Sequence, residues 1–296
     1  MNIIGKLRVW LSLVCIFFCV AESKAENEFA FETGKIVTAG IEMPYRSLRV
    51  GDSEKPSLVI YLHGGSSKGT DNEKQMKEAG IDSIANYLKS RQMDAIFLVP
   101  QCPPDKSWSG PMLGVVKSLI DKHVRDEIVD ENKLYIFGGS MGGTGTWGML
   151  SAYPGLFTAA MPVAGNPSKC DADNVATVPL FTVMGTADRI MSVETVSDFI
   201  NELNARSGIT RFEVEEGWSH EMTCIQSYTT QRLDWVFCHL HNPTGIEKAP
   251  TTHRALRSTL YYSIDGSPLP EPPVKGLYVM RKVYDDGSVT SHTKVR

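Results

Sequence analysis

A single serine flanked by glycines is the first candidate reactive residue in this sequence. The segment Gly138-Gly139-Ser140-Met141-Gly142-Gly143 directly follows the apolar, β-prone run 134–137. A strand-like run that breaks into glycines around one serine, before a second apolar segment, predicts a strand, a tight turn and a helix. In that context G-x-S-x-G is typical of a nucleophile elbow, a strained turn that exposes the serine Oγ. A Gly/Ser loop without chemistry is the alternative.

A serine hydroxyl needs partners before it can attack a carbonyl group. At neutral pH it is a poor nucleophile, so a histidine must accept its proton and a carboxylate must orient that histidine. In parallel sheets of this kind the partners follow the serine in the order acid, then histidine, at the carboxyl ends of later strands. Asp188 follows the buried run 179–184, and His220 follows the strand-like run 212–215. We therefore predict Ser140 as the nucleophile, His220 as the general base and Asp188 as the orienting acid.

The other acids and histidines fit this chemistry less well. Asp171 and Asp173 also follow the serine, but neither comes directly after a strand, and Asp188 itself has the alternative of a turn or helix-capping role. The remaining histidines lie before the serine, on a helix face, at the end of the last helix or in the tail: His63, His123, His239, His241, His253 and His292. Only His220 has both the order and the position that the chemistry requires.

A tetrahedral intermediate also needs hydrogen-bond donors for its negatively charged oxygen. The segment His63-Gly64-Gly65 follows the apolar run 57–62, where such a donor loop is expected, and the residue after the nucleophile supplies the second donor. We predict the backbone N–H groups of Gly65 and Met141 as the two oxyanion donors. This chemistry requires no metal ion and no cofactor.

Strand and helix patterns alternate across about two hundred residues, which predicts an α/β fold with a mostly parallel sheet and helices on both faces. Near-continuous apolar runs predict strands buried on both faces. Apolar residues at helical spacing predict a helix over 110–126, and Ser192 is a candidate N-cap for another. Residues 29–50 are expected to form an opening antiparallel pair of strands, with a turn at Glu32-Thr33-Gly34. A Thr70-x-x-Glu73 capping box is expected to open a helix that runs to Arg91. A closing helix is expected over 228–240.

The two ends of the chain differ from its centre. Residues 1–25 combine a basic start, an apolar segment and Ser23-Lys24-Ala25, which predicts a cleaved export signal, with cleavage after Ala21 or a retained anchor as alternatives. Residues 26–244 form the predicted catalytic domain. Past that boundary, 245–258 is polar and without pattern, and 259–296 contains short β-prone runs, so 245–296 is a predicted linker and β-rich tail.

The net charge bears on the possible partners, and the cysteine content bears on the possible disulfides. Removal of the leader lowers the net charge from −4 to −6, because it contains three basic residues and one acid. An acidic chain without basic clusters argues against nucleic acid as a partner, and the mature chain has no apparent membrane segment. Export permits disulfides, but the sequence leaves the pairing open, apart from disfavouring Cys224 with Cys238 if one helix separates them. The four cysteines of the mature chain are Cys102, Cys170, Cys224 and Cys238.

Several motifs together resemble a known family. Thr70-Asp71-Asn72-Glu73, Pro100-Gln101-Cys102-Pro103, Met43-Pro44-Tyr45-Arg46 and the segment 140–147 are similar to secreted α/β-hydrolases of the carboxylesterase and feruloyl-esterase type, related to prolyl oligopeptidase. The resemblance covers residues 30–240 and implies the α/β-hydrolase fold and an ester substrate on plant polysaccharide. One departure is Met184-Gly185, where the family more often has His-Gly before the acid. The tail resembles a type IX secretion sorting domain; a small β appendage that covers the hydrolase or binds carbohydrate is the alternative.

These observations predict an exported serine esterase that removes acyl or feruloyl groups from a small-molecule or polysaccharide ester. Its expected location is the periplasm, the cell surface or the medium, and the tail is a candidate ligand for secretion machinery. Among tryptophans expected near the cleft, we assign Trp108 a substrate-binding role, while Trp147 has the alternative of packing under the elbow helix. A serine peptidase with the same triad, and a non-catalytic binding protein with the same fold, are the alternative functions.

Overall fold

A computed structural model of the protein describes residues 29–126, 128–239, 256–263, 267–275, 277–284 and 289–295. The predicted export signal and the predicted boundary near residue 244 lie outside these ranges. No helix within them is long and apolar enough to span a membrane.

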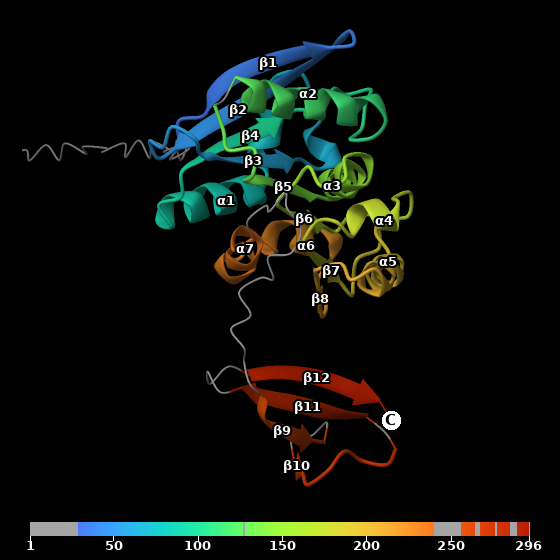
Figure 1. Ribbon diagram of the computed structural model, residues 1–296. Helices are drawn as coiled ribbons and strands as arrows, with labels where there is room; N and C mark the ends of the chain where they lie inside the picture. The colour runs from blue at the N-terminus through green and yellow to red at the C-terminus, as the bar shows by residue number, and fades with distance from the viewer. Residues whose placement is uncertain are drawn as a thin grey trace, which may run out of the picture.

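An eight-stranded sheet forms the centre of residues 29–239 (Figure 1). Its spatial order is β1-β2-β4-β3-β5-β6-β7-β8. The strands from β3 to β8 are parallel, whereas β2 pairs antiparallel with both β1 and β4. The strand bounds are β1 Glu32–Thr38, β2 Ile41–Val50, β3 Ser57–Leu62, β4 Ala95–Pro100, β5 Leu134–Gly139, β6 Ala159–Val163, β7 Leu180–Gly185 and β8 Thr210–Glu215. The predicted mostly parallel α/β fold is confirmed.

Helices cover both faces of this sheet because the central strands are apolar on both sides. Along β3, Leu58 and Ile60 pack with one core cluster, while Val59 and Tyr61 pack with the other. The first cluster lies under α2 Pro111–Arg125, α3 Met141–Ala152, α4 Ala172–Val175 and α5 Val193–Ala205. The second lies under α1 Ala79–Ser90 and α7 Thr230–Phe237, and α6 His220–Gln226 precedes α7. The helix predicted over 110–126 and the Ser192 N-cap are both confirmed, since Ser192 Oγ accepts from the Thr195 N–H.

Two local predictions are wrong. The first turn falls at Ala39 and Gly40, both at positive φ, and Thr33 and Gly34 lie inside β1. Thr70 caps no helix: a loop with a short 3-10 turn, η2 Lys74–Lys77, comes first, and α1 starts only at Ala79. The predicted closing helix over 228–240 is confirmed with shorter bounds, as α7 Thr230–Phe237, and α6 before it was not predicted.

The C-terminal segment forms its own antiparallel sheet, in the order β10-β9-β11-β12. Its strands are β9 Leu256–Tyr262, β10 Pro268–Leu269, β11 Leu277–Tyr284 and β12 Val289–Val295. The predicted β-rich character of the tail is therefore confirmed.

Candidate active site

Ser140 occupies a sharp turn between β5 and α3. Its backbone is left-handed, with φ 59° and ψ −117°, a strained conformation for a residue with a side chain. The flanking glycines are required by close packing: a Cβ on Gly142 would lie 1.7 Å from the Leu62 carbonyl oxygen, and one on Gly138 would lie 2.4 Å from that of Gly142. The turn is a nucleophile elbow in geometry as well as in sequence.

The three residues predicted as a triad lie in one hydrogen-bonded row. Ser140 Oγ lies 2.7 Å from His220 Nε2, and His220 Nδ1 lies 2.7 Å from Asp188 Oδ2. The acid side chain is fully buried, while the histidine side chain is 15 % exposed. An ionised carboxylate accepts hydrogen bonds only, so Nδ1 carries the ring proton and Nε2 is free to accept from the serine hydroxyl. This tautomer is the one that a general base in this position would need.

The loops that hold the acid and the histidine are joined to each other. Asp188 Oδ1 accepts from the N–H groups of Ile190 and Met191, so its carboxylate is held on both oxygens. The Ala187 N–H donates to the Trp218 carbonyl, which links this loop to the one that leads to His220. Gly185 is part of the same contact, because a Cβ there would lie 2.2 Å from that carbonyl oxygen.

The loop after β3 brings the other predicted donor toward the nucleophile. Gly65 begins a 3-10 turn, η1 Gly65–Ser67, and Met141 begins α3, so neither N–H has a partner within its own helix. No hydrogen bond involving either N–H is found within the described part of the chain. A Cβ on Gly64 would lie 3.7 Å from Ser140 Cβ, which places this loop directly against the nucleophile. Both N–H groups therefore remain free to donate to a developing oxyanion.

A carboxylate that the sequence patterns did not single out fastens this loop from behind. Glu78 Oε1 accepts from the Gly64 N–H at 2.9 Å and from the Ser67 hydroxyl at 2.7 Å. Glu78 Oε2 lies 3.4 Å from the Tyr61 hydroxyl. Fourteen residues separate Glu78 from Gly64, so no local pattern signals the contact.

His63 holds the same loop to the end of β4. The ring is fully buried, and its Nε2 accepts from the Cys102 N–H at 2.9 Å, so Nδ1 carries the proton and donates to the Gly64 carbonyl at 2.7 Å. Burial lowers the pKa of His63 to about 4, and the ring is therefore neutral at ordinary pH. The His63 carbonyl in turn accepts from the Trp108 indole N–H.

Two motifs that support the family resemblance meet in one polar network behind the loop after β3, which is called here the donor loop. Gln101 Nε2 donates to Asp71 Oδ1 at 2.7 Å, and Gln101 Oε1 accepts from the Asn72 N–H at 2.6 Å. The same Asp71 oxygen accepts from two further backbone N–H groups, and these bonds, with that from Gln101 foremost, lower its pKa to about 2. Arg46 Nε donates to the Asn72 carbonyl. These residues shape the loop and do not reach the nucleophile.

A pocket of about 770 Å³, called here the nucleophile pocket, opens above Ser140 and His220. Its wall includes Gly65 and Glu78 from the donor loop side and Cys224 from α6. A Cβ on Gly139 would lie 3.5 Å from the Cys224 Sγ, so the thiol packs beside the elbow, and burial raises its pKa to about 12. The thiol is therefore protonated and unreactive at neutral pH.

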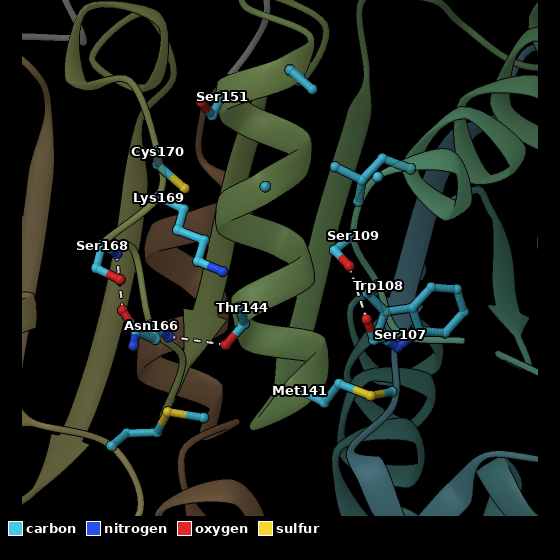
Figure 2. Close-up of a pocket in the computed structure, with 15 residues that line it drawn as sticks. Ser107, Trp108, Ser109, Met141, Thr144, Ser151, Asn166, Ser168, Lys169 and Cys170 are labelled. Atoms are coloured by element: carbon cyan, nitrogen blue, oxygen red, sulfur yellow. Dashed lines mark hydrogen bonds between the residues drawn. The ribbon is translucent and has the colours of Figure 1, made fainter. Parts of the chain in front are cut away.

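A second pocket, of about 610 Å³, follows one face of α3 and is called here the α3 pocket (Figure 2). Met141, the residue after Ser140, lies in its wall. Its other walls come from the segments around Trp108 and Lys169. Trp108, predicted to bind substrate, does line this pocket but is only 2 % exposed, since its indole is bonded to the donor loop.

The other expected features near the cleft are structural. Trp147 is fully buried and packs edge-on against Phe199 at 5.5 Å, under the elbow helix. Trp218 lies against the guanidinium of Arg232. All four described cysteines are free thiols, in agreement with the disfavoured pairing of Cys224 with Cys238.

Strand order, elbow and the order of the site residues along the sheet together define the α/β-hydrolase fold. Among solved structures, a thermostable esterase matches with TM-score 0.66 and 29 % identity, over 72 % of this chain and 64 % of that one. This chain therefore spans less than two thirds of that esterase's length.

More distant structures share the fold alone. A ferulic acid esterase matches with TM-score 0.57 and 14 % identity, over 70 % of this chain and 98 % of that one. A puromycin-hydrolyzing peptidase of Mycobacterium tuberculosis matches with TM-score 0.57 and 15 % identity, over 75 % of this chain and 41 % of that one. No protein-family model and no curated protein sequence matches the chain.

Proposed function

We propose that this chain is a serine hydrolase of carboxylic esters, with Ser140, His220 and Asp188 as its catalytic triad. The observation that supports this most directly is the row of two 2.7 Å contacts that joins Asp188 to His220 and His220 to the hydroxyl of a serine at positive φ. A thermostable esterase with 29 % identity to this chain supports esters as the substrate class.

The proposed reaction follows from which groups hold protons. His220 Nε2 takes the Ser140 proton as Oγ attacks the ester carbonyl, and Asp188 stabilises the imidazolium that forms. The N–H groups of Gly65 and Met141 donate to the oxyanion of the tetrahedral intermediate. His220 then gives its proton to the departing alcohol, which leaves an acyl group on Ser140. A water molecule, deprotonated by His220, attacks the acyl-enzyme and releases the acid.

The proposed substrate is an acyl or feruloyl ester on plant polysaccharide, and the proposed location is outside the cytoplasm. Both rest on the family resemblance and on the export pattern of residues 1–25, and the proposed sorting role of residues 245–296 rests on resemblance too. A serine peptidase is the alternative that the fold also serves, as in the puromycin-hydrolyzing peptidase.

Labelling with a fluorophosphonate probe tests the nucleophile. The purified protein is expected to become labelled once per chain, and Ser140→Ala is expected to lose the label while keeping its melting temperature. An unlabelled wild-type protein would favour the non-catalytic alternative.

A substrate panel then tests the ester class. We expect hydrolysis of methyl ferulate and of short p-nitrophenyl esters, with Ser140→Ala as the blank, and little hydrolysis of aminoacyl amides. A preference for the amides would contradict the esterase proposal and favour the peptidase.

A further inference from the structure

The α3 pocket contains hydrogen-bond donors for which the described residues show no acceptor. Lys169 reaches the pocket from the loop after β6, and Figure 2 shows its ammonium directed toward α3, above Thr144. No ion pair or hydrogen bond of the Lys169 ammonium is present in the described part of the chain. A cation is therefore available beside the pocket.

The acids nearest to Lys169 along the chain have other partners. Asp171 caps α4, accepting from the N–H groups of Asp173 and Asn174. The Asp173 carboxylate pairs with Arg206. No aspartate or glutamate lines the α3 pocket, so its only formal charge is the positive one of Lys169.

Two neutral side chains with donor groups, Asn166 and Thr144, line the same pocket. Asn166 Oδ1 accepts from the Ser168 N–H at 2.9 Å, which leaves the side-chain NH₂ group as the free end of the amide. Thr144 Oγ1 accepts from the Asn166 N–H at 3.0 Å, which leaves the hydroxyl proton available. Figure 2 shows Thr144 at the α3 wall, below the Lys169 ammonium, and the Asn166 side chain turned away from α3 toward Ser168. The ammonium and the Thr144 hydroxyl, on the α3 side of the pocket, form a pair of donors suited to a carboxylate.

We infer that the α3 pocket binds a carboxylate of the substrate, so that the enzyme prefers esters with an anionic group near the ester bond. This inference rests on the proposed function, because it takes Ser140 as the nucleophile. Thr144 lies one helical turn from Met141, so a carboxylate bound there is about 5 Å along the helix axis from the oxyanion donor, the reach of a three-carbon spacer. Trp108 and Leu113 provide an apolar wall for such a spacer.

The carboxylate has two chemical sources, the acyl chain or the alcohol, and matched ester pairs distinguish them. The acyl pair is monoethyl glutarate and ethyl hexanoate; the alcohol pair is the butanoate ester of 3-hydroxypropanoate and butyl butanoate. The measured quantity is the ratio of kcat/KM for the anionic ester to kcat/KM for its neutral partner. Each rate is monitored by titration of the released acid. Within one pair, intrinsic reactivity cancels when wild type and variant are compared.

In the pair that the pocket recognises, Lys169→Met is expected to lower this ratio about tenfold, and Lys169→Arg is expected to retain most of it. Raising the salt concentration lowers the wild-type ratio and leaves that of Lys169→Met unchanged. Lys35→Met, which removes an equal charge from the ion pair with Glu42 on the β1–β2 hairpin, is the matched control and keeps the ratio. A ratio that stays the same in Lys169→Met for both pairs overturns the inference.

A binding measurement separates this inference from the proposed function. Ser140→Ala cannot turn over an ester, so calorimetric titration with monoethyl glutarate and with the butanoate ester of 3-hydroxypropanoate reads affinity alone. At least one is expected to bind Ser140→Ala about tenfold more tightly than Ser140→Ala/Lys169→Met. Equal affinity of both ligands for the two proteins would contradict the carboxylate site. A wild-type protein that binds through Lys169 but hydrolyses no ester would contradict only the proposed function.

Discussion

The loop after β3 and the first residue of α6, which follows β8, each place a histidine near the elbow, and the two rings have opposite surroundings. Both ring nitrogens of His63 are bonded to backbone groups, and the ring is fully buried. Both ring nitrogens of His220 face side chains, those of Ser140 and Asp188, and its side chain is partly exposed. The backbone partners of His63 fix one neutral tautomer at ordinary pH, whereas the partners of His220 are the hydroxyl and the carboxylate that the proposed mechanism requires.

The comparison extends to how each loop is held in place. The loop after β8 is tied to the neighbouring loop after β7, which brings acid and histidine together along the sheet edge. The loop after β3 is held by Glu78 and by the network around Gln101, and its backbone at Gly64 lies against Ser140. In the proposed mechanism, one side of the site therefore supplies side-chain chemistry, and the other supplies backbone N–H donors.

The largest expected effect is the loss of proton transfer at His220. His220→Gln is expected to lower kcat by about 10⁴-fold or more, because the described part of the chain shows no other partner that could accept the Ser140 proton. The melting temperature is expected to change little, since Asp188 keeps its two backbone donors. Steady-state kinetics with a p-nitrophenyl ester and calorimetric unfolding provide the two measurements.

His63→Gln is the matched variant, and the opposite balance is expected for it: a clear loss of stability with a smaller loss of kcat in the folded fraction. A His220 variant that keeps activity within tenfold of wild type would remove this histidine from the mechanism.

The second effect concerns the carboxylate behind the donor loop. Glu78→Ala removes the acceptor for the Gly64 N–H and the Ser67 hydroxyl, so Gly65 is no longer held against the nucleophile. We expect kcat to fall about 10²-fold, comparable to the loss of one oxyanion donor, with a smaller change in KM. Glu78→Gln keeps one acceptor oxygen and is expected to lose about tenfold.

Affinity for a trifluoromethyl ketone, which forms a tetrahedral adduct, is expected to fall in parallel with kcat across this series. Glu73→Ala, an exposed acid in the same segment, is the control. A Glu78→Ala protein with full affinity for the ketone would show that the carboxylate has only a structural role.

The third effect is a pH dependence of stability from His63. Its pKa is about 4 in the folded protein and near 6.5 when unfolded, so the unfolded chain binds more protons between these values. The free energy of unfolding therefore falls as pH drops from 6.5 toward 4, by about 2 kcal/mol at pH 4.5 from this group. Urea unfolding at pH 7, 5.5 and 4.5 measures the slope, and subtraction of the His63→Gln slope isolates the histidine. Equal slopes in the two proteins would contradict the assignment.

What the sequence predicts well is set by local pattern. The buried strands β3, β4, β5 and β7 are continuous apolar runs, and the elbow has glycines at the positions where backbone atoms nearly touch. The order of serine, acid and histidine along the chain follows from the order of the strands. The fold class, and the histidine and acid that form the hydrogen-bonded row with Ser140, can therefore be predicted from the sequence.

The features that the sequence does not predict depend on contacts between distant segments. Thr70-x-x-Glu73 has the form of a capping box, but the intervening Asp71 turns to Gln101, thirty residues away, and the helix begins only at Ala79. Glu78 and Lys169 belong to no motif, because their importance lies in which loop or pocket the fold brings beside them. Such contacts become visible only in three dimensions.

The smallest expected effect is at Gly65, and it sharpens the contrast between backbone and side-chain roles. A Cβ at this position would meet no atom within 4 Å, and the predicted catalytic group is the N–H, which alanine keeps. We therefore expect Gly65→Ala to lower kcat/KM for a short-chain ester less than fivefold, chiefly through KM, because the new methyl group lies at the nucleophile pocket. Gly142→Ala is the matched control: its Cβ would lie 1.7 Å from a backbone oxygen, a collision that no side-chain rotation relieves, and soluble expression is expected to fail. A loss in kcat of more than 100-fold in Gly65→Ala, with the fold intact by circular dichroism, would show that the loop needs glycine for its conformation and not only for its donor.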